Sequence, residues 1–339
     1  MARFPLFAVA LAALSLAPVR AAKTLDVFFI DVEGGQATLF VAPSGQSLLV
    51  DTGWRGFDGR DAQRIKLAAR KAHIKRIDYV MITHYHRDHV GGVPALANLM
   101  KIGTFVDHGP NREDSKVTRE DYADYERTPP KASGHMVVKP GDKIPVKGLD
   151  ITVVAADGNH ITTPLPGAGQ PNPFCANAAQ HENDPSENAR SVGIFMQLGK
   201  FRLVDLGDLT WNKELALMCP NNPIGTADVF VVSHHGMFLS NSPQLVDAIH
   251  PRVAIMDNGA RKGGSEQAWQ TVHDSPGLED LWQLHFALAG GSAHNSPDPM
   301  IANIDAKCQG LYLRLIANSD GGFTVYNSRN KYEKTYAPR

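Results

Sequence analysis

Four side chains that commonly bind metal ions lie within six residues of each other, in the run Thr83–Gly92 (THYHRDHVGG). Side chains alternate between two sides of an extended strand, so His84 and His86 are expected to reach one ion together. The turn that follows is expected to present Asp88 and His89 to a second ion beside the first. Imidazole and carboxylate groups suit Zn²⁺ best, although Mn²⁺ and Fe²⁺ accept the same ligands.

A solvated turn that happens to hold polar residues is the alternative for this segment. It follows Ile77–Thr83, a nearly continuous apolar run typical of a strand buried on both faces, and a helix is expected from about His89 to Met100. A dense group of histidines and an aspartate directly after a buried strand has little structural purpose. The pattern therefore favours a metal centre.

Short β-rich runs surround this segment. Leu25–Val32, Ala37–Val41 and Ser47–Val50 are separated by turn residues and predict an antiparallel meander, and Asp61–Ala72 has helical periodicity. Further β-rich runs follow at Ser191–Leu198, Phe201–Leu206, Val229–Ser233, Val253–Met256, Leu311–Ile316 and Phe323–Tyr326. This order predicts an α/β fold with two packed sheets covered by helices on their outer faces.

Two stretches interrupt this pattern. Residues 107–134 are strongly polar, and residues 157–188 are rich in Pro, Gly and Asn. Both predict long surface insertions, which often form lids or substrate walls. The sequence shows no internal repeat or low-complexity linker, so one domain from residue 22 to 339 is expected after the N-terminal segment.

Residues 1–21 have the pattern of a secretory signal. Arg3 precedes an apolar stretch, Phe4–Ala17, and the small-residue site Val19–Ala21 follows. The apolar stretch is shorter than the roughly 20 residues that span a bilayer, so cleavage is expected rather than a membrane anchor. The mature chain is therefore predicted to be periplasmic or secreted.

The net charge of the chain limits the kinds of molecule that it is expected to bind. The formal net charge is −1, so no global positive field would gather nucleic acid or an anionic membrane. A small-molecule or cell-envelope ester, held by metal or by a few basic side chains, is the expected substrate.

Export allows one disulfide, and Cys175 with Cys219 is the preferred pair because both lie in irregular segments. Cys308 is then expected to be a buried small hydrophobic residue.

The run HYHRDH, residues 84–89, resembles the HxHxDH signature of the metallo-β-lactamase superfamily. Val50–Gly53 resembles its first motif, Val204–Asp208 its GD motif, and Val232–Gly236 the SHHG element of one branch. That branch contains the nuclease-like domain of competence proteins (ComEC-like) and the teichoic acid phosphorylcholine esterase, and its IDVGQGD-type opening strand is matched by Ile30–Ala37. The resemblance covers the chain from about residue 25 to residue 256.

This resemblance implies the αββα sandwich of that superfamily and two divalent metal ions, most readily Zn²⁺. Asp208 would bridge the ions and Asp51 would support the metal-binding turn from behind. His235 would bind the second ion, while His234 would protonate the leaving group or stabilise the oxyanion; the order of these two is reversible. Asp88 would be both ligand and acceptor for the attacking water.

The chain departs from the family pattern in two places. Asn188 stands where many members carry a third histidine, which leaves the first ion with His84, His86 and Asp208 unless His181 or His160 completes it. After Val253–Met256 the branch's Gly-His-Pro is missing, and His294 is a guess for its replacement. The segment there instead holds three polar residues that contact an anionic substrate or form an ordinary solvated turn: Asn258, Arg261 and Lys262.

The predicted activity is hydrolysis by a metal-activated water, with a phosphodiester favoured by the resemblance. A lactonase or β-lactamase-like carbonyl hydrolase is the alternative, because the same metals support it. A third hypothesis, motivated by the absent third histidine, is a non-catalytic, metal-poor binding protein. The sequence leaves the native metal and the oligomeric state open.

Overall fold

The structure is a computed structural model that describes residues 1, 24–128, 132–305 and 308–339. The predicted signal segment, apart from Met1, lies outside the described residues. Among the described residues, no helix is both long and apolar enough to cross a membrane.

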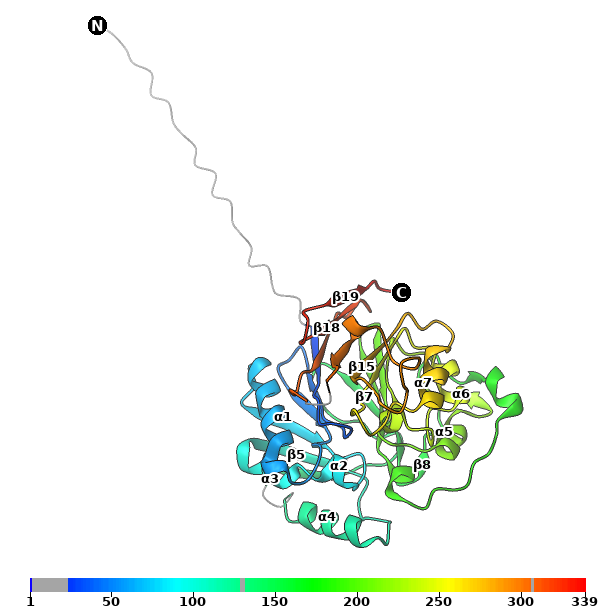
Figure 1. Ribbon diagram of the computed structural model, residues 1–339, viewed down its shortest axis with the longest axis horizontal. Helices are drawn as coiled ribbons and strands as arrows, with labels where there is room; N and C mark the ends of the chain where they lie inside the picture. The colour runs from blue at the N-terminus through cyan, green and yellow to red at the C-terminus, as the bar shows by residue number, and fades with distance from the viewer. Residues whose placement is uncertain (2–23, 129–131, 306–307) are drawn as a thin grey trace.

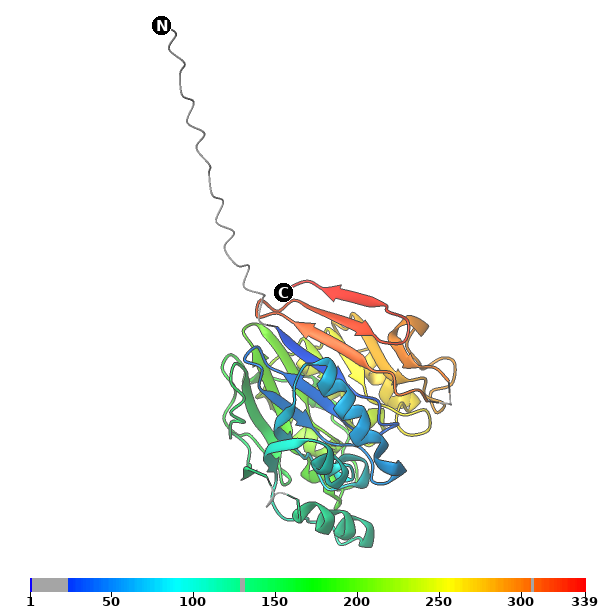
Figure 2. The ribbon, with the colours of Figure 1, turned by 90° about the vertical axis from the view of Figure 1, so that its left-hand side faces the viewer.

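One large sheet is built mainly from the two ends of the chain. Its order is β19-β18-β17-β1-β2-β3-β4-β5-β6. The strands are β1 (Leu25–Phe29), β2 (Thr38–Val41), β3 (Ser47–Val50), β4 (Arg76–Met81), β5 (Lys101–Asp107), β6 (Gly134–Val137), β17 (Leu313–Ala317), β18 (Phe323–Asn327) and β19 (Glu333–Tyr336). The predicted meander is confirmed, since β1, β2 and β3 pair antiparallel. Strands β17 to β19 continue the sheet at one edge (Figure 2).

The second sheet is built from the middle of the chain. Its order is β16-β15-β14-β13-β11-β10-β7-β8. The strands are β7 (Asp150–Ala156), β8 (Asn159–His160), β10 (Gly193–Leu198), β11 (Phe201–Asp205), β13 (Val229–Val231), β14 (Val253–Met256), β15 (Asp280–His285) and β16 (Ile301–Asn303). From β11 to β16 neighbouring strands are parallel, so their carboxyl ends share one edge.

The two sheets face each other across a shared core, to which Phe40 and Met81 contribute from the first sheet and Met196 and Ile255 from the second. The main helices are α1 (Arg60–Lys71), α2 (Arg87–Val90), α3 (Val93–Leu99), α4 (Lys116–Glu126), α5 (Trp211–Met218), α6 (Pro243–Ile249) and α7 (Glu266–His273). Helices α1 and α3 cover the outer face of the first sheet, and α5, α6 and α7 that of the second (Figure 1). The predicted αββα sandwich is confirmed.

The prediction of a single helix from about residue 89 to 100 is wrong. The chain forms α2 and α3 with a break at Gly91 and Gly92. A Cβ on Gly92 would lie 2.1 Å from the backbone oxygen of Thr52, and one on Gly91 would lie 2.3 Å from the backbone nitrogen of Arg55. The two glycines therefore let the start of this helical region pack directly against the loop after β3.

The polar insertion 107–134 is only partly a surface loop. It contains α4, whose Tyr125 is buried and donates a hydrogen bond to Asp107 Oδ2 at 2.5 Å. Outside this insertion, Trp282 is fully buried on β15.

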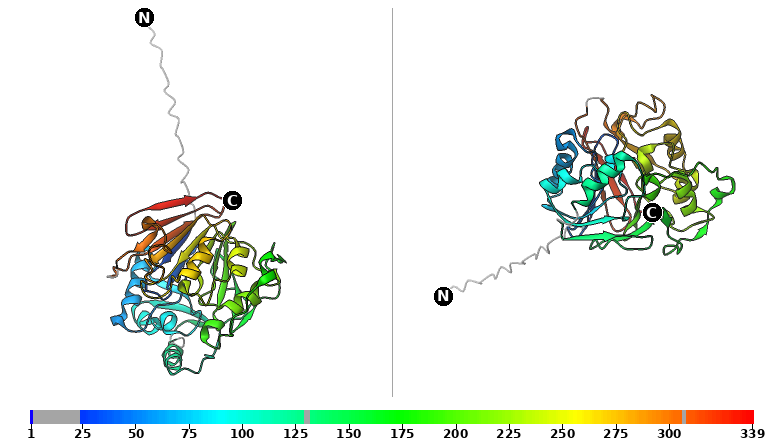
Figure 3. Two further views of the ribbon diagram at one scale, coloured as in Figure 1. Left: turned by 45° about the vertical axis from the view of Figure 1, so that its right-hand side comes forward. Right: turned by 90° about the horizontal axis from the view of Figure 1, so that it is seen from below.

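The Pro- and Gly-rich segment 157–188 lies on the side of α5 and α6 (Figure 3). It contributes β9 (Gln170–Pro171), which pairs with β12 (Asn221–Asn222). The predicted disulfide is present, joining Cys175 to Cys219 with their Cα atoms 5.8 Å apart. This bond fastens the segment to the end of α5.

Candidate metal centre

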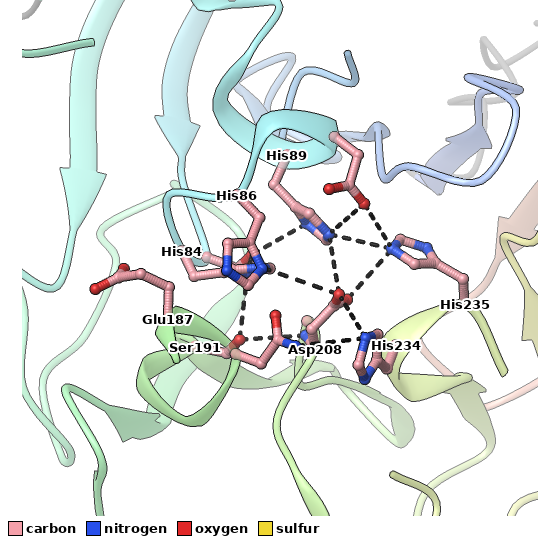
Figure 4. Close-up of polar contacts among 12 residues, drawn as sticks. His84, His86, His89, Glu187, Ser191, Asp208, His234 and His235 are labelled. Atoms are coloured by element: carbon pink, nitrogen blue, oxygen red, sulfur yellow. Dashed lines mark hydrogen bonds and ion pairs between the residues drawn. The ribbon is translucent and has the colours of Figure 1, made fainter. Parts of the chain in front are cut away.

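The predicted site residues meet where strands of both sheets end. His84, His86, Asp88 and His89 follow β4, Asp208 follows β11, and His234 and His235 follow β13. Figure 4 shows the turn after β4 facing the two turns from the second sheet across the site. Residues from opposite halves of the chain are thus brought together at the edge of the sandwich.

Asp88, His89, Asp208 and His235 form a compact, buried group whose donor atoms all lie within 4.8 Å of one another. His89 Nε2 lies 3.3 Å from Asp88 Oδ2 and 3.2 Å from Asp208 Oδ2. His235 Nε2 lies 3.2 Å from Asp88 Oδ2 and 3.4 Å from Asp208 Oδ1. Two imidazoles and two carboxylates are therefore directed at one point.

The hydrogen bonds behind these imidazoles test whether the group fits a cation. His89 Nδ1 is 2.7 Å from Asp51 Oδ2, and His235 Nδ1 is 3.3 Å from Asp257 Oδ1. With Nδ1–H donating to a carboxylate, each ring presents a lone pair on Nε2. The two Nε2 atoms lie 3.1 Å apart, where two lone pairs repel unless a proton or a cation lies between them. The donor set therefore fits a divalent metal ion.

Asp51 supports the metal-binding turn where the resemblance implied. Its carboxylate is fully buried and accepts hydrogen bonds from the backbone N–H of Thr83 at 2.8 Å and from Thr83 Oγ at 2.7 Å, besides His89. Burial raises the pKa of Asp51, although the hydrogen bonds and charge of His89 oppose the shift. One aspartate thus holds both the end of β4 and the orientation of His89.

Burial and the neighbouring charges shift the pKa values of this group in opposite directions, and the neighbouring charges have the larger effect. Burial alone would raise the pKa of Asp208, but His235 and His89 hold that pKa well below its usual range. Burial likewise would lower the pKa of His235, and Asp208 outweighs it, raising the pKa to about 10. In the metal-free group the protonated imidazoles therefore supply the positive charge that a bound cation would supply in their place, and each ring presents its Nε2 lone pair once that proton is displaced by the metal.

A second group of atoms lies on the other side of Asp208. His84 Nε2 is 3.9 Å and His234 Nε2 is 3.5 Å from Asp208 Oδ2. Among the described side chains, buried His84 Nε2 and Asp208 Oδ1 have no hydrogen-bond partner. The rings of His84 and His86 are perpendicular, with centroids 4.7 Å apart. His84 and Asp208 therefore face each other beside the four-residue group, and the ring of His86 lies next to that of His84.

Asn188 lies next to His234. Its Nδ2 is 3.4 Å from His234 Nε2, and the opposite ring nitrogen is 3.3 Å from Ser240 Oγ. His234 and His235 both have positive φ, 54° each, which turns the two rings to different sides. The two adjacent histidines therefore point apart, and Asn188 contacts the one that does not join the four-residue group.

The three histidines proposed as replacement ligands lie elsewhere. His181 stacks on Trp211 with ring centroids 4.2 Å apart, and His160 lies on β8. His294 Nε2 is 3.5 Å from Glu266 Oε1 at the start of α7. Among the described side chains, none of the three contacts the group around Asp208, so the structure gives no support to these guesses.

Three contacts of the site were missed or left open by the sequence. Glu113 Oε2 is 2.8 Å from His86 Nε2, and Asp257 orients His235. Lys262 Nζ contacts Asp88 Oδ2 and lies 5.2 Å from the centre of the Trp54 ring. No local motif marks Glu113 or Asp257, whereas Lys262 was considered as an anion contact because it follows a strand end.

Comparison with known proteins identifies a family that matches part of this chain. A model of the metallo-beta-lactamase superfamily matches residues 31–171, which include the turn after β4 and its supporting loop after β3. The chain contains a metallo-beta-lactamase superfamily domain. The family assignment made from HYHRDH is thereby confirmed, and with it the expectation of a metal-dependent hydrolase.

Curated relatives of this superfamily domain are distant. ComE operon protein 3 from Bacillus subtilis (strain 168) is 25% identical over 256 residues, 69% of this chain and 28% of that protein. The lactamase-like protein vrtG from Penicillium aethiopicum is 27% identical over 128 residues, 38% of this chain and 34% of that protein. This chain thus spans about a third or less of the length of either relative.

Solved structures align with much of this chain at low sequence identity. A CmlA beta-hydroxylase E377D mutant matches 79% of this chain and 53% of its own, with 14% identity and a TM-score of 0.43.

Proposed function

We propose that this domain is an exported phosphodiesterase that works with two divalent metal ions, most readily Zn²⁺. The observation that carries the proposal is the position of Lys262. Its ammonium contacts Asp88 at the edge of the four-residue group, and its side chain is 31% exposed. A cation that is partly open to solvent and adjoins two candidate metal positions suits an anionic phosphoryl group.

In this proposal Asp88, His89, Asp208 and His235 would hold the second ion, and His84, His86 and Asp208 would hold the first. Divalent ions bound there would supply a lowered pKa for water and polarisation of the phosphoryl oxygen. Asp51 and Asp257 fix the rings of His89 and His235 by accepting hydrogen bonds from their Nδ1–H groups. When substrate enters, Lys262 exchanges its contact with Asp88 for one with the phosphoryl oxygens.

His234 acts on the departing oxygen. Burial lowers the pKa of His234 to about 4, so its imidazole is neutral at neutral pH. A neutral ring donates one hydrogen bond, which stabilises negative charge as it develops on the leaving oxygen. Asp88 accepts a hydrogen bond from the attacking water and so orients it. Ser240 Oγ, 3.3 Å from His234 Nδ1, keeps the ring in place by donating to Nδ1 and leaves Nε2–H as the donor to the leaving oxygen.

The similarity to ComE operon protein 3 and the SHHG element support phosphodiester rather than carbonyl chemistry. The net charge of −1 argues against long duplex nucleic acid, so a small or cell-envelope phosphodiester is the proposed substrate. The metal-poor binding protein has less support, because four of its proposed ligands already converge within 4.8 Å.

A substrate panel tests the proposed activity. The mature chain, stripped of metal and reloaded with zinc or with manganese, is assayed on bis(p-nitrophenyl) phosphate, a lactone and a cephalosporin. Turnover of the phosphodiester is expected, and His86→Ala should abolish it together with metal binding. Turnover of only the lactone or the cephalosporin would replace the phosphodiesterase with the carbonyl hydrolase.

Export is proposed from the N-terminal pattern and supported by the disulfide between Cys175 and Cys219, a bond that persists in oxidising compartments. Expression in a bacterium followed by cell fractionation tests it. A periplasmic or secreted product whose mass lacks residues 1–21 is expected, and an intact chain retained in the cytosol would overturn the proposal.

A further inference from the structure

A second group of metal-binding side chains lies outside the site around Asp208. Asp31 follows β1, His285 ends β15, and Cys308 precedes β17. His285 Nε2 is 2.8 Å from Asp31 Oδ1, and Cys308 Sγ is 2.6 Å from Asp31 Oδ2 and 3.8 Å from His285 Nε2. Their ligand atoms all lie within 4.8 Å of one another.

Two of the three side chains in this group are almost completely buried. Asp31 is fully buried and His285 is 1% exposed, while Cys308 is partly open to solvent. The sequence-based expectation that Cys308 is a buried hydrophobic residue is therefore wrong. Its sulfur contacts a carboxylate and lies near an imidazole rather than apolar side chains.

We propose that Asp31, His285 and Cys308 form an additional zinc site, separate from the two ions of the hydrolytic centre. Thiolate, imidazole and carboxylate are the three ligand types that Zn²⁺ prefers. Zinc bonds of about 2.0 to 2.3 Å require ligand atoms some 3 to 4 Å apart, which small side-chain movements achieve here. Solvent reaches the partly open Cys308 and supplies the fourth ligand.

Arg64 is a positively charged neighbour of two of the proposed zinc ligands. It lies 3.1 Å from Asp31 Oδ2 and 3.5 Å from Cys308 Sγ. It also donates to the backbone oxygen of Asp31 at 2.9 Å and pairs with Glu33 at 3.2 Å. These two partners remain when the ligand atoms turn to an ion, so Arg64 keeps two acceptors, one of them a carboxylate.

Charge balance follows from the ligand types. Zn²⁺ replaces the proton on Cys308 Sγ, one Zn–S bond forms, and one H⁺ passes to solvent, while His285 binds through Nε2 as the neutral tautomer with its ring proton on Nδ1. The thiolate and the Asp31 carboxylate together carry two negative charges, equal to the charge of the ion, and Arg64 keeps its own positive charge beside them. No oxidant or reductant takes part in the step.

The position of this zinc site suggests a structural role next to the hydrolytic centre. Asp31 begins the loop whose Gly34 packs against Lys262: a Cβ on Gly34 would lie 2.9 Å from Lys262 Cβ. The backbone N–H of Gln36, in the same loop, donates to the Asp88 backbone oxygen at 3.2 Å. Zinc would fasten this loop to β15 and to the segment before β17.

Cobalt gives a signal that only this zinc site can produce. A thiolate bound to Co²⁺ absorbs in the near ultraviolet through sulfur-to-metal charge transfer. The hydrolytic centre has no sulfur ligand among its predicted residues, and Cys175 and Cys219 are joined in the disulfide. The metal-free mature chain is therefore titrated with Co²⁺ without reductant, and both the absorption and the bound cobalt are measured.

The native chain is expected to show the thiolate band and to bind one more equivalent of cobalt than Cys308→Ser, which should lack the band. His285→Asn should weaken cobalt binding at the same site, and far-ultraviolet circular dichroism checks that both variants fold. Added zinc should also slow alkylation of Cys308 in the native chain. A native chain saturated with cobalt but without the band, or a band that persists in Cys308→Ser, would overturn the proposal.

His86→Ala separates this inference from the proposed function. That variant should lose phosphodiester hydrolysis yet keep the cobalt–thiolate band. Cys308→Ser should instead retain turnover by its hydrolytic centre. A band without any phosphodiester turnover would leave the zinc site standing and remove only the proposed activity.

Discussion

His86 Nε2 lies 2.8 Å from Glu113 Oε2, and this contact joins the metal-binding turn to the polar segment after β5. The carboxylate is itself held, because Glu113 Oε2 accepts the backbone N–H of Glu187 at 3.0 Å and Oε1 accepts Thr118 Oγ–H at 3.0 Å. With Nε2 engaged by Glu113, Nδ1 is the atom that His86 offers to a metal. Glu113 is therefore a positioning residue for the first ion.

Removing this carboxylate should weaken metal binding without removing a ligand. Glu113→Ala is expected to raise the dissociation constant of the first ion by about 10- to 100-fold, because the ring of His86 loses its orientation. Glu113→Gln keeps an acceptor oxygen and should lie between. Competition with a chromophoric chelator measures the constant, and Asp114→Asn, whose side chain is 93% exposed, is the control. Equal affinities for native and Glu113→Ala chains would contradict this role.

Glu113 should also give the metal-free protein an acid-sensitive stability. The hydrogen bond from His86 lowers the pKa of Glu113 from 4.5 to about 2, with burial opposing it. Because the folded pKa is depressed, this stabilisation is present above pH 4.5 and is lost as the pH falls toward about 2. Urea unfolding of native and Glu113→Gln chains should therefore give a difference in unfolding free energy that shrinks as the pH falls through that window. A constant difference would rule the linkage out.

The two adjacent histidines should respond differently to substitution. His235→Asn is expected to lose about one equivalent of metal, because His235 Nε2 is one of four convergent ligand atoms. His234→Asn should keep the metal and lower kcat by about 10²- to 10⁴-fold, since His234 is assigned to the leaving oxygen. Metal analysis and steady-state kinetics check both. If His234→Asn also loses metal, the ring is a ligand of the first ion.

The sequence predicts the parts of the fold in which hydrophobic runs are long or alternating. The meander of β1 to β3 and the buried β4 lie within two or three residues of their expected bounds. Strand β5 was not assigned, because Gly103 interrupts its apolar run. That glycine is required by tertiary packing, since a Cβ there would lie 2.3 Å from the backbone oxygen of Asp78 on β4. The glycine that weakens the local pattern is thus the one that permits the strand pairing.

The candidate site likewise contains residues that the sequence predicts and residues that it does not. Residues within one short motif, such as His84 and His89, are predicted because local geometry brings them together. Glu113 is 27 residues from His86, and Asp257 is 22 residues from His235, in loops whose paths depend on the packing of α4 and β14. A carboxylate in a loop has no local signature, so sequence reasoning misses Glu113 and Asp257, whereas Asp51, which orients His89, is predicted because it lies in a recognisable family motif.

The disulfide between Cys175 and Cys219 should contribute strongly to stability. It closes a loop with a sequence separation of 44, for which the loss of chain entropy in the unfolded state corresponds to about 4 kcal/mol. A chain with Cys175→Ser and Cys219→Ser should therefore unfold at lower urea concentration. Reductant should destabilise the native chain to the same level and leave the double variant unchanged, which separates loss of the bond from packing changes. If reduction does not shift native unfolding, the segment 157–188 is held by its other contacts, such as the pairing of β9 with β12.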